Sequence, residues 1–133
     1  MIAAVCTYCS RPKSKDAGYV PALRRYLSDR ITALATQAES ENRLFLILSG
    51  RYGLITGDTP LPDYDHLLMP SETAQCARTL HKQMTALNIS AVDYHTADPE
   101  RYPEVRPYLN ALAEAAGDAG VTVKVIILPG NPV

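Results

Sequence analysis

The sequence predicts an α/β domain with a mostly parallel sheet of about four strands and helices on both faces. Short apolar runs of strand length alternate along the chain with segments whose apolar residues recur every three or four positions. The 133 residues fit a single domain, 1–133, with one core. The 47% of hydrophobic residues and 20% of charged residues are ordinary for a globular protein.

The first half of the chain supplies two expected strands and one expected helix. The run IAAVCTY at 2–8 has the length and apolar character of a strand. Over 20–38, apolar residues at spacings of three and four predict an amphipathic helix. The continuous apolar run at 43–49 is typical of a parallel strand covered on both faces. The segment 48–68 then reads as a long irregular loop, and loops of this length in compact domains tend to be functional.

The second half continues the alternation. Ser71 is the expected N-cap of a helix with an apolar stripe that reaches Leu87. The remaining expected elements are a strand at 89–95, a helix over 104–116 closed by Gly117 or Gly120, and a strand at 121–128. In such sheets ligands bind beyond the carboxyl ends of the strands, where the segments TYCSRPKSK and SGRYGLITGDTPLPDYD begin.

Composition narrows the location and the chemistry. No apolar run approaches the roughly 18 residues of a membrane span, and the start lacks a secretory signal, so we expect a cytoplasmic protein. Cys6 and Cys9 form a C-x-x-C, but no second metal-binding pair follows it. The histidines at 66, 81 and 95 lack metal-ligand spacing, and we expect no metal and no cofactor. Cys9 stays open between a reactive thiol and a half-buried one.

Basic residues gather in the first part of the chain, although the net charge is −1. They could form a local phosphate-facing patch or a solvated surface. With no global positive charge, we do not expect indiscriminate binding to nucleic acid as the main role. The residues of the expected patch are Arg11, Lys13, Lys15, Arg24, Arg25 and Arg30.

The segment CSRPK places a thiol, a hydroxyl and an ammonium after the first strand, at Cys9, Ser10 and Lys13. Such groups at a strand end suit a phosphate or a carboxylate, and the alternative is a polar loop. The glycines of both nucleotide-binding fingerprints are absent.

The segment SGRYG follows the second strand. Gly50 and Gly53 allow positive φ or a close approach of a ligand to the backbone. Tyr52 between them can stack on a planar ring or plug the strand end. Ser49 is a candidate polar residue, although G-x-S-x-G is absent and a covalent serine is not expected.

The segment PDYDHLL carries two carboxylates that point one way and a tyrosine that points the other. Asp65 is the candidate acid/base or ribose-binding carboxylate, and His66 beside it can titrate near neutrality. The alternative is a surface turn with both aspartates in solvent. We expect the loop to fold back so that Tyr64 points inward with its hydroxyl bonded, while Asp65 comes near Ser49, Ser10 or Lys13.

Taken together, CS-x-x-K, LSG-x-YGL and YD-x-x-L resemble a small YaaA-like family of bacterial and phage proteins, and the start is similar to the archaeosine synthase core. The resemblance covers mainly residues 4–30 and 44–69. The matching residues are Cys9, Ser10, Lys13, Ser49, Gly50, Tyr52, Gly53, Tyr64 and Asp65, with a looser match at Tyr26 and Ser28.

This resemblance implies a nucleobase-containing small molecule or a nucleic acid as the partner, and no membrane. The expected function is an enzyme that acts on a nucleobase, nucleoside or nucleotide by N-glycosidic cleavage, base exchange or base modification. Asp65, Ser49 and Lys13 are the expected catalytic residues. The alternative is a non-catalytic nucleotide- or nucleic-acid-binding module in a stress or defence role. The expected substrate-binding residues are Cys9, Ser10, Tyr26, Ser28, Gly50, Tyr52, Gly53 and Tyr64.

Overall fold

A computed structural model describes residues 2–130, which form one five-stranded sheet with the order β4-β3-β1-β6-β7. The predicted α/β class with a mostly parallel sheet is confirmed. The sheet has one strand more than expected because the segment after β3 turns back and pairs with it antiparallel. The strands of the sheet are β1 (Ile2–Tyr8), β3 (Leu44–Ser49), β4 (Gly53–Ile55), β6 (Ile89–Ala97) and β7 (Thr122–Leu128).

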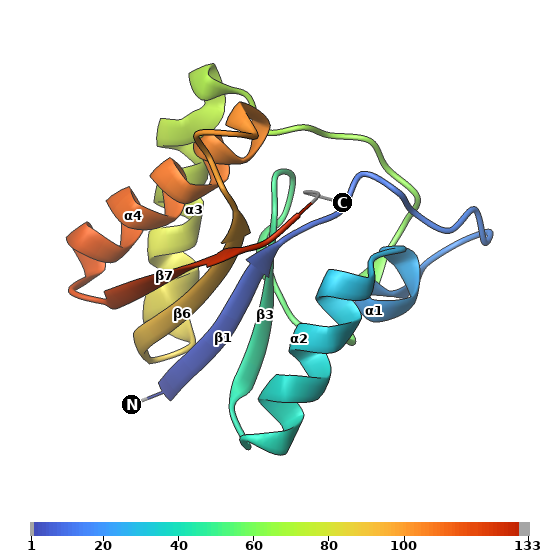
Figure 1. The fold of residues 1–133 in the computed structure, drawn as a ribbon, viewed down its shortest axis with the longest axis horizontal. Helices are drawn as coiled ribbons and strands as arrows, with labels where there is room; N and C mark the ends of the chain where they lie inside the picture. Colours follow the sequence, from blue (N-terminus) through green and yellow to red (C-terminus); the bar gives the residue numbers. More distant parts are fainter. Residues whose placement is uncertain (1, 131–133) are drawn as a thin grey trace.

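Helices cover both faces of the sheet, as the alternation predicted. Helix α2 (Asp29–Ser40) lies on one side, and α3 (Thr73–Ala86) and α4 (Arg106–Ala119) lie on the other (Figure 1). Neighbouring residues of β1 point to opposite faces. Val5 therefore packs in the small cluster under α2, whereas Cys6 belongs to the main core. No helix within residues 2–130 is long and apolar enough to cross a membrane.

The prediction of a single helix over 20–38 is wrong. The chain forms β2 (Val20–Pro21), then α1 (Ala22–Arg25), and starts α2 afresh at Asp29. Tyr26 is extended because it forms an isolated antiparallel bridge with Lys13, which an α-helical backbone could not make. Ser28 then caps α2 by accepting a hydrogen bond from the amide of Ile31 at 3.3 Å.

A short 3₁₀ turn precedes each of the two later helices. Helix α3 follows the 3₁₀ turn η1 (Pro70–Glu72), so Ser71 lies inside that turn and is not the N-cap. Helix α4 likewise follows η2 (Pro103–Val105). It ends at Gly120, one of the two expected glycines, whose φ of 70° is the left-handed geometry that glycine adopts without strain.

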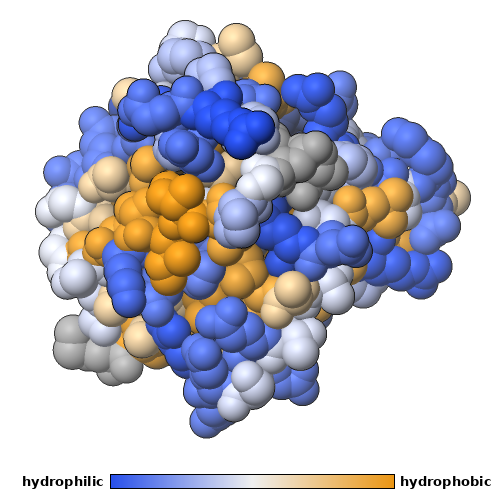
Figure 2. All heavy atoms as spheres, viewed as in Figure 1, coloured by the Kyte–Doolittle hydropathy of each residue, from blue (hydrophilic) through white to orange (hydrophobic). Residues whose placement is uncertain are grey.

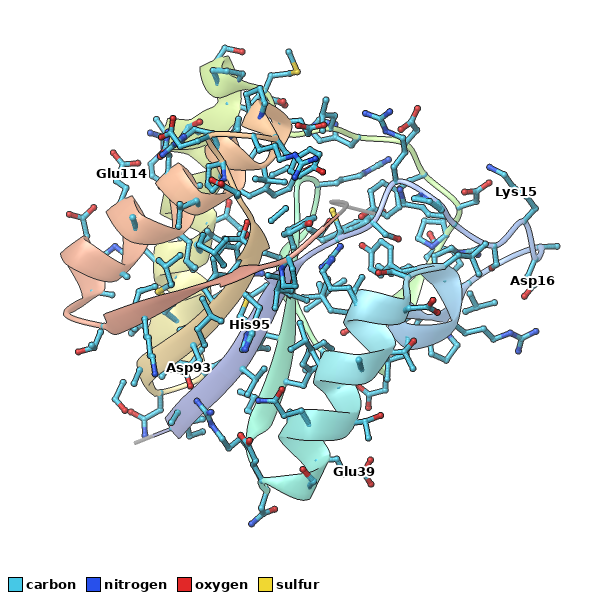
Figure 3. The ribbon with its side chains drawn as sticks, viewed as in Figure 1. Lys15, Asp16, Glu39, Asp93, His95 and Glu114 are labelled. Carbon is cyan, nitrogen blue, oxygen red and sulfur yellow. The ribbon has the colours of Figure 1, made fainter. Side chains whose placement is uncertain are left out.

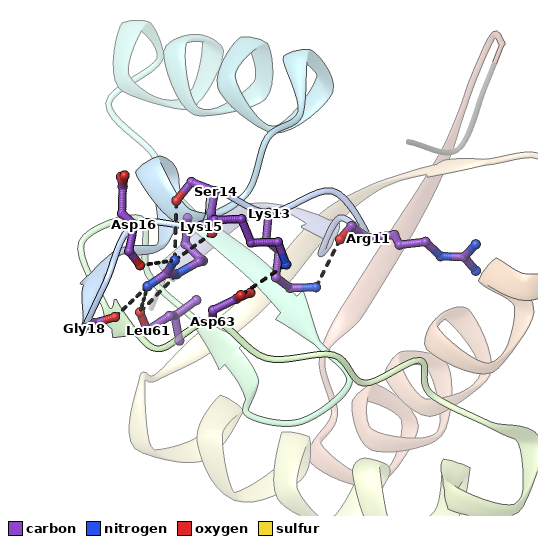
Figure 4. A network of polar contacts seen from close by, with 9 residues as sticks. Arg11, Lys13, Ser14, Lys15, Asp16, Gly18, Leu61 and Asp63 are labelled. Carbon is purple, nitrogen blue, oxygen red and sulfur yellow. Dashed lines mark hydrogen bonds and ion pairs between the residues drawn. The ribbon is translucent and has the colours of Figure 1, made fainter.

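The segment 48–68 is less irregular than expected, because it contributes both β4 and β5 (Pro60–Leu61). Strand β5 pairs antiparallel with β2. Arg25 fastens this small ribbon: its fully buried guanidinium donates to the carbonyl oxygens of Ser14, Asp16 and Leu61, among others (Figure 4). A buried cation therefore ties the segment after β1 to the segment after β3.

Candidate functional site

A cavity of about 290 Å³ lies at the carboxyl end of β1. The predicted segments meet there, because its lining includes Cys9, Lys13 and Asp65. A further wall comes from η2 and α4 and includes Tyr108. A second cavity of about 410 Å³ adjoins the first, since Lys13 and Asp65 line both. The expected meeting of the two loops at one site is thus present in the structure.

Tyr64 is the hub that holds the second loop in place. Its ring is buried, and its hydroxyl lies 2.5 Å from the hydroxyl of Tyr26 and 2.8 Å from Oγ of Ser49. The prediction that Tyr64 points inward with a bonded hydroxyl is confirmed. Burial raises the pKa of the Tyr64 phenol to about 12, so the group stays protonated at neutral pH.

Lys13 projects over this tyrosine pair. Its Nζ lies 4.6 Å from the centre of the Tyr64 ring, within the range of a cation–π contact. Its hydrogen bond goes to the carbonyl oxygen of Arg11, at 3.4 Å. Burial lowers the pKa of the Lys13 ammonium, and nearby Cys9 and Asp65 partly oppose that shift. Lys13 therefore holds its proton less firmly than an ordinary lysine.

Asp65 and Asp63 occupy different surroundings. Asp63 forms an exposed ion pair with Lys15, with 3.1 Å between Nζ and the carboxylate. Asp65 is also exposed, but it lines the cavity and acts electrostatically on Lys13. Within residues 2–130, no hydrogen bond joins Asp65 to Lys13, Ser10 or Ser49. Its carboxylate is thus placed beside the cavity and stays available to a ligand.

The wall from α4 was not predicted. The hydroxyl of Tyr108 accepts a hydrogen bond from the amide of Leu68 at 3.1 Å and lies 3.9 Å from Sγ of Cys9. Burial raises the pKa of the Tyr108 phenol, which keeps it neutral. Glu104 and Val105 of η2 complete this wall. In the sequence Tyr108 resembles any other member of a helical apolar stripe, so no local signal marked it.

Several expected site residues support the loops: Ser49, predicted as catalytic, and Ser28 and Ser10, predicted as substrate-binding. Ser49 is fully buried, and its Oγ accepts hydrogen bonds from the amides of Arg51 and Tyr52, at 3.2 and 3.1 Å. The Ser28 side chain caps α2. Ser10 lines the cavity, but its hydroxyl donates to the carbonyl of Pro12 at 2.7 Å.

The glycine-tyrosine-glycine turn also packs closely against the returning loop. Gly50 lies so close to the returning loop that a Cβ there would be 3.2 Å from the carbonyl oxygen of His66 and the amide of Leu68. Gly53 has a φ of 73°, in the left-handed region. The Tyr52 ring packs edge-on against Tyr64, with 5.2 Å between the ring centres. Tyr52 thus plugs the strand end, which is the second of its expected roles.

The expected patch of six cations does not exist as one surface. Arg25 is fully buried, and the guanidinium of Arg30 stacks 3.7 Å from the centre of the Tyr8 ring. Arg24 and Lys15 are paired with the carboxylates of Asp16 and Asp63. Figure 3 shows Lys15 and Asp16 at the outer tip of their loop, away from the sheet. Because these cations already have partners within the protein, they do not form a continuous surface for binding phosphates.

Metal-binding side chains do not gather among the described residues, where no group of three or more histidine, cysteine or acidic side chains is placed to hold an ion. Cys6 points into the core, and burial raises the pKa of its thiol. Cys9 belongs to the same core cluster but also lines the cavity. Of the C-x-x-C pair, Cys9 alone therefore reaches the site.

Comparison with known proteins adds no relative: no family model, no curated protein and no solved structure matches this chain.

The tyrosine hub gives a direct stability prediction. Replacing Tyr64 by phenylalanine removes one buried hydroxyl and leaves those of Tyr26 and Ser49 without their shared partner. We expect the free energy of unfolding to fall by about 1–3 kcal/mol, as for other buried polar groups left unsatisfied. Urea denaturation measures the change. Tyr19→Phe is the control, since Tyr19 is 72% exposed. An equal fall in the free energy of unfolding in both variants would contradict the role of Tyr64 as the hub.

Proposed function

We propose that this protein is an enzyme that cleaves or exchanges the N-glycosidic bond of a nucleobase-containing small molecule. The observation that carries the proposal is the cavity at the carboxyl end of β1, in which Lys13 and Asp65 lie beside Tyr8 and Tyr108. At about 290 Å³ its volume lies just below that of typical small-molecule sites, which occupy roughly 300–1,000 Å³. A small planar ligand with a polar attachment fits that description.

The two charged groups have complementary roles in such a reaction. When the C–N bond breaks, its electrons leave with the base and the anomeric carbon becomes oxocarbenium-like. The exposed carboxylate of Asp65 stabilises that positive charge. The ammonium of Lys13 gives its proton to the departing ring nitrogen, which its lowered pKa favours. Water, or an incoming base in the exchange reaction, then bonds to the anomeric carbon and gives up a proton, which the neutral amine of Lys13 takes back.

The rest of the cavity suits a nucleobase. Tyr8 and Tyr108 contribute aromatic side chains to the lining, and Glu104 offers a carboxylate that can accept from exocyclic amino groups. The sequence resemblance to YaaA-like proteins and to the archaeosine synthase core supports the same class of ligand. In this proposal Ser49 positions the loop through Tyr64, and the enzyme is cytoplasmic.

A panel of nucleosides and nucleotides tests the proposal, with released base measured by chromatography. We expect at least one member to be cleaved, and both Asp65→Asn and Lys13→Met to reduce turnover by about 10²–10⁴-fold. Lys15→Met is the matched control, because Lys15 lies two positions away and is engaged by Asp63. Absence of turnover on the whole panel, or full activity in both variants, would overturn the glycosidase assignment.

A non-catalytic nucleotide sensor is the second candidate. It is favoured by one observation: Asp65 is exposed and bears no hydrogen bond to Lys13 within residues 2–130, so the site is not tightly preorganised. A sensor would be stabilised by its ligand, by about 2.7 kcal/mol at a hundredfold excess over Kd, without releasing product. Thermal unfolding with the same panel, read beside the chromatograms, separates the two functions.

A further inference from the structure

The two edges of the sheet differ in whether their backbone groups are covered by other parts of the protein. The β4 edge is short and is covered by the side-chain amide of Gln83 from α3. Its Oε1 accepts from the amide of Leu54 at 2.7 Å, and its Nε2 donates to the carbonyl of Tyr52 at 3.1 Å. The amide of Leu54 and the carbonyl of Tyr52 at this edge are thus bonded within the molecule. An edge covered in this way does not offer a template to another strand.

The opposite edge has no such cover in the described part of the chain. Strand β7 runs for seven residues and, within residues 2–130, has β6 as its one neighbour in the sheet, in a parallel pair. Its side chains include exposed Val125 and Ile127, at 43% and 50%. Figure 2 shows apolar atoms gathered on the part of the surface where Figure 1 draws β7. Lys124 is the single charged residue of this strand, and within residues 2–130 no side-chain amide bonds to its outer edge as Gln83 does at β4.

We propose that β7 pairs antiparallel with β7 of a second copy of this chain, about a two-fold axis that passes through Val125. Antiparallel pairing makes the row of amide and carbonyl groups on an edge strand complementary to itself, as a two-fold interface requires. Val125 is the midpoint of Thr122–Leu128, so this register pairs the whole strand. The two sheets then become one continuous sheet.

The side chains favour this register. Val125 lies opposite Val125 of the second copy, and Val123 lies opposite Ile127, which gives one face of β-branched pairs. Lys124 lies opposite Ile126 of the second copy. An axis through Lys124 would instead place two ammonium groups opposite each other, which is destabilising in a strand pair. The exposed apolar side chains of β7 in the two copies then pack against each other.

This interface is independent of the proposed function. Neither Lys13 nor Asp65 belongs to β7, and the cavity lining contains no residue of that strand. The two proposals therefore rest on different residues, and either can fail without the other.

Sedimentation velocity over a range of protein concentrations tests the dimer. We expect twice the mass of the chain at high concentration. Val125→Lys should weaken association by roughly tenfold or more, since the substitution sets like charges against each other at the axis. Leu27→Lys is the matched control, because Leu27 is 54% exposed and lies outside the sheet. A monomer at every concentration, or equal weakening by Leu27→Lys, would overturn the proposal.

Disulfide trapping tests the axis without relying on a charged variant. Directly opposed residues of an antiparallel pair have Cβ atoms about 4.5–5.5 Å apart, so Val125→Cys should give a covalent dimer on mild oxidation. Ile127→Cys faces Val123 of the second copy and should stay monomeric under reducing-agent-free electrophoresis. The native cysteines at 6, 9 and 76 are buried and provide the background in the unaltered chain. Cross-linking of Ile127→Cys but not Val125→Cys would refute the two-fold axis at Val125.

Discussion

Arg25→Met is expected to lower the free energy of unfolding by about 3–5 kcal/mol, the range reached when a buried charged group loses its network. Arg25 is fully buried, and its guanidinium serves the carbonyl oxygens of Ser14, Asp16, Gly18 and Leu61, at 2.6–3.3 Å. Methionine keeps much of the apolar stem but donates no hydrogen bond. The carbonyl oxygens of Ser14, Asp16 and Gly18 would lose their hydrogen bonds from Arg25, and the loop before β2 would lose its anchor.

Arg24→Met is the matched control for that variant. Arg24 is adjacent in sequence and also cationic, but its side chain is exposed and forms one ion pair with Asp16, at 3.2 Å. Exposed pairs contribute about 0–1 kcal/mol, so its loss should be small. Chemical denaturation of both variants measures the difference. Similar losses would mean that the buried network of Arg25 contributes little to stability.

Gly53→Ala is expected to cost about 2–4 kcal/mol, because two separate penalties combine at this position. The backbone of Gly53 has a φ of 73°, a conformation that strains any residue with a Cβ. The added Cβ would also overlap Oε1 of Gln83 and lie 3.1 Å from Cγ2 of Thr79. Gln83 would have to move, and its hydrogen bonds to Leu54 and Tyr52 at the β4 edge would be lost.

Gly120→Ala separates those two penalties. Gly120 has nearly the same φ, 70°, but a Cβ there would meet no atom within 4 Å. We expect it to lose only the conformational share, about 1–2 kcal/mol. Thermal unfolding of both variants gives the difference, which is the cost of displacing Gln83. Equal losses would show that Gln83 shifts at no cost. A larger loss in Gly53→Ala, accompanied by aggregation, would link Gln83 to protection of the β4 edge.

The candidate site was half predictable from the sequence. The segments after β1 and β3 could be placed together, because parallel strands bring their carboxyl ends to one edge of the sheet. The inward position of Tyr64 followed from the alternation in PDYD. The wall made by Glu104, Val105 and Tyr108 could not be foreseen. It depends on how α4 packs against a loop about forty residues earlier in the chain, as in the bond between Tyr108 and Leu68.

By itself the sequence determined the α/β class and the strands at 2–8 and 43–49, and it narrowed the end of α4 to Gly117 or Gly120. These features follow from local periodicity and local backbone preference, which depend on residues close by in the sequence. The tertiary structure decided the break in the helix expected over 20–38, since the bridge from Lys13 holds Tyr26 extended. It also decided that Arg25 is buried while its neighbour Arg24 is exposed. Contacts between distant segments set both outcomes, because a residue's propensity does not contain the position of its partners.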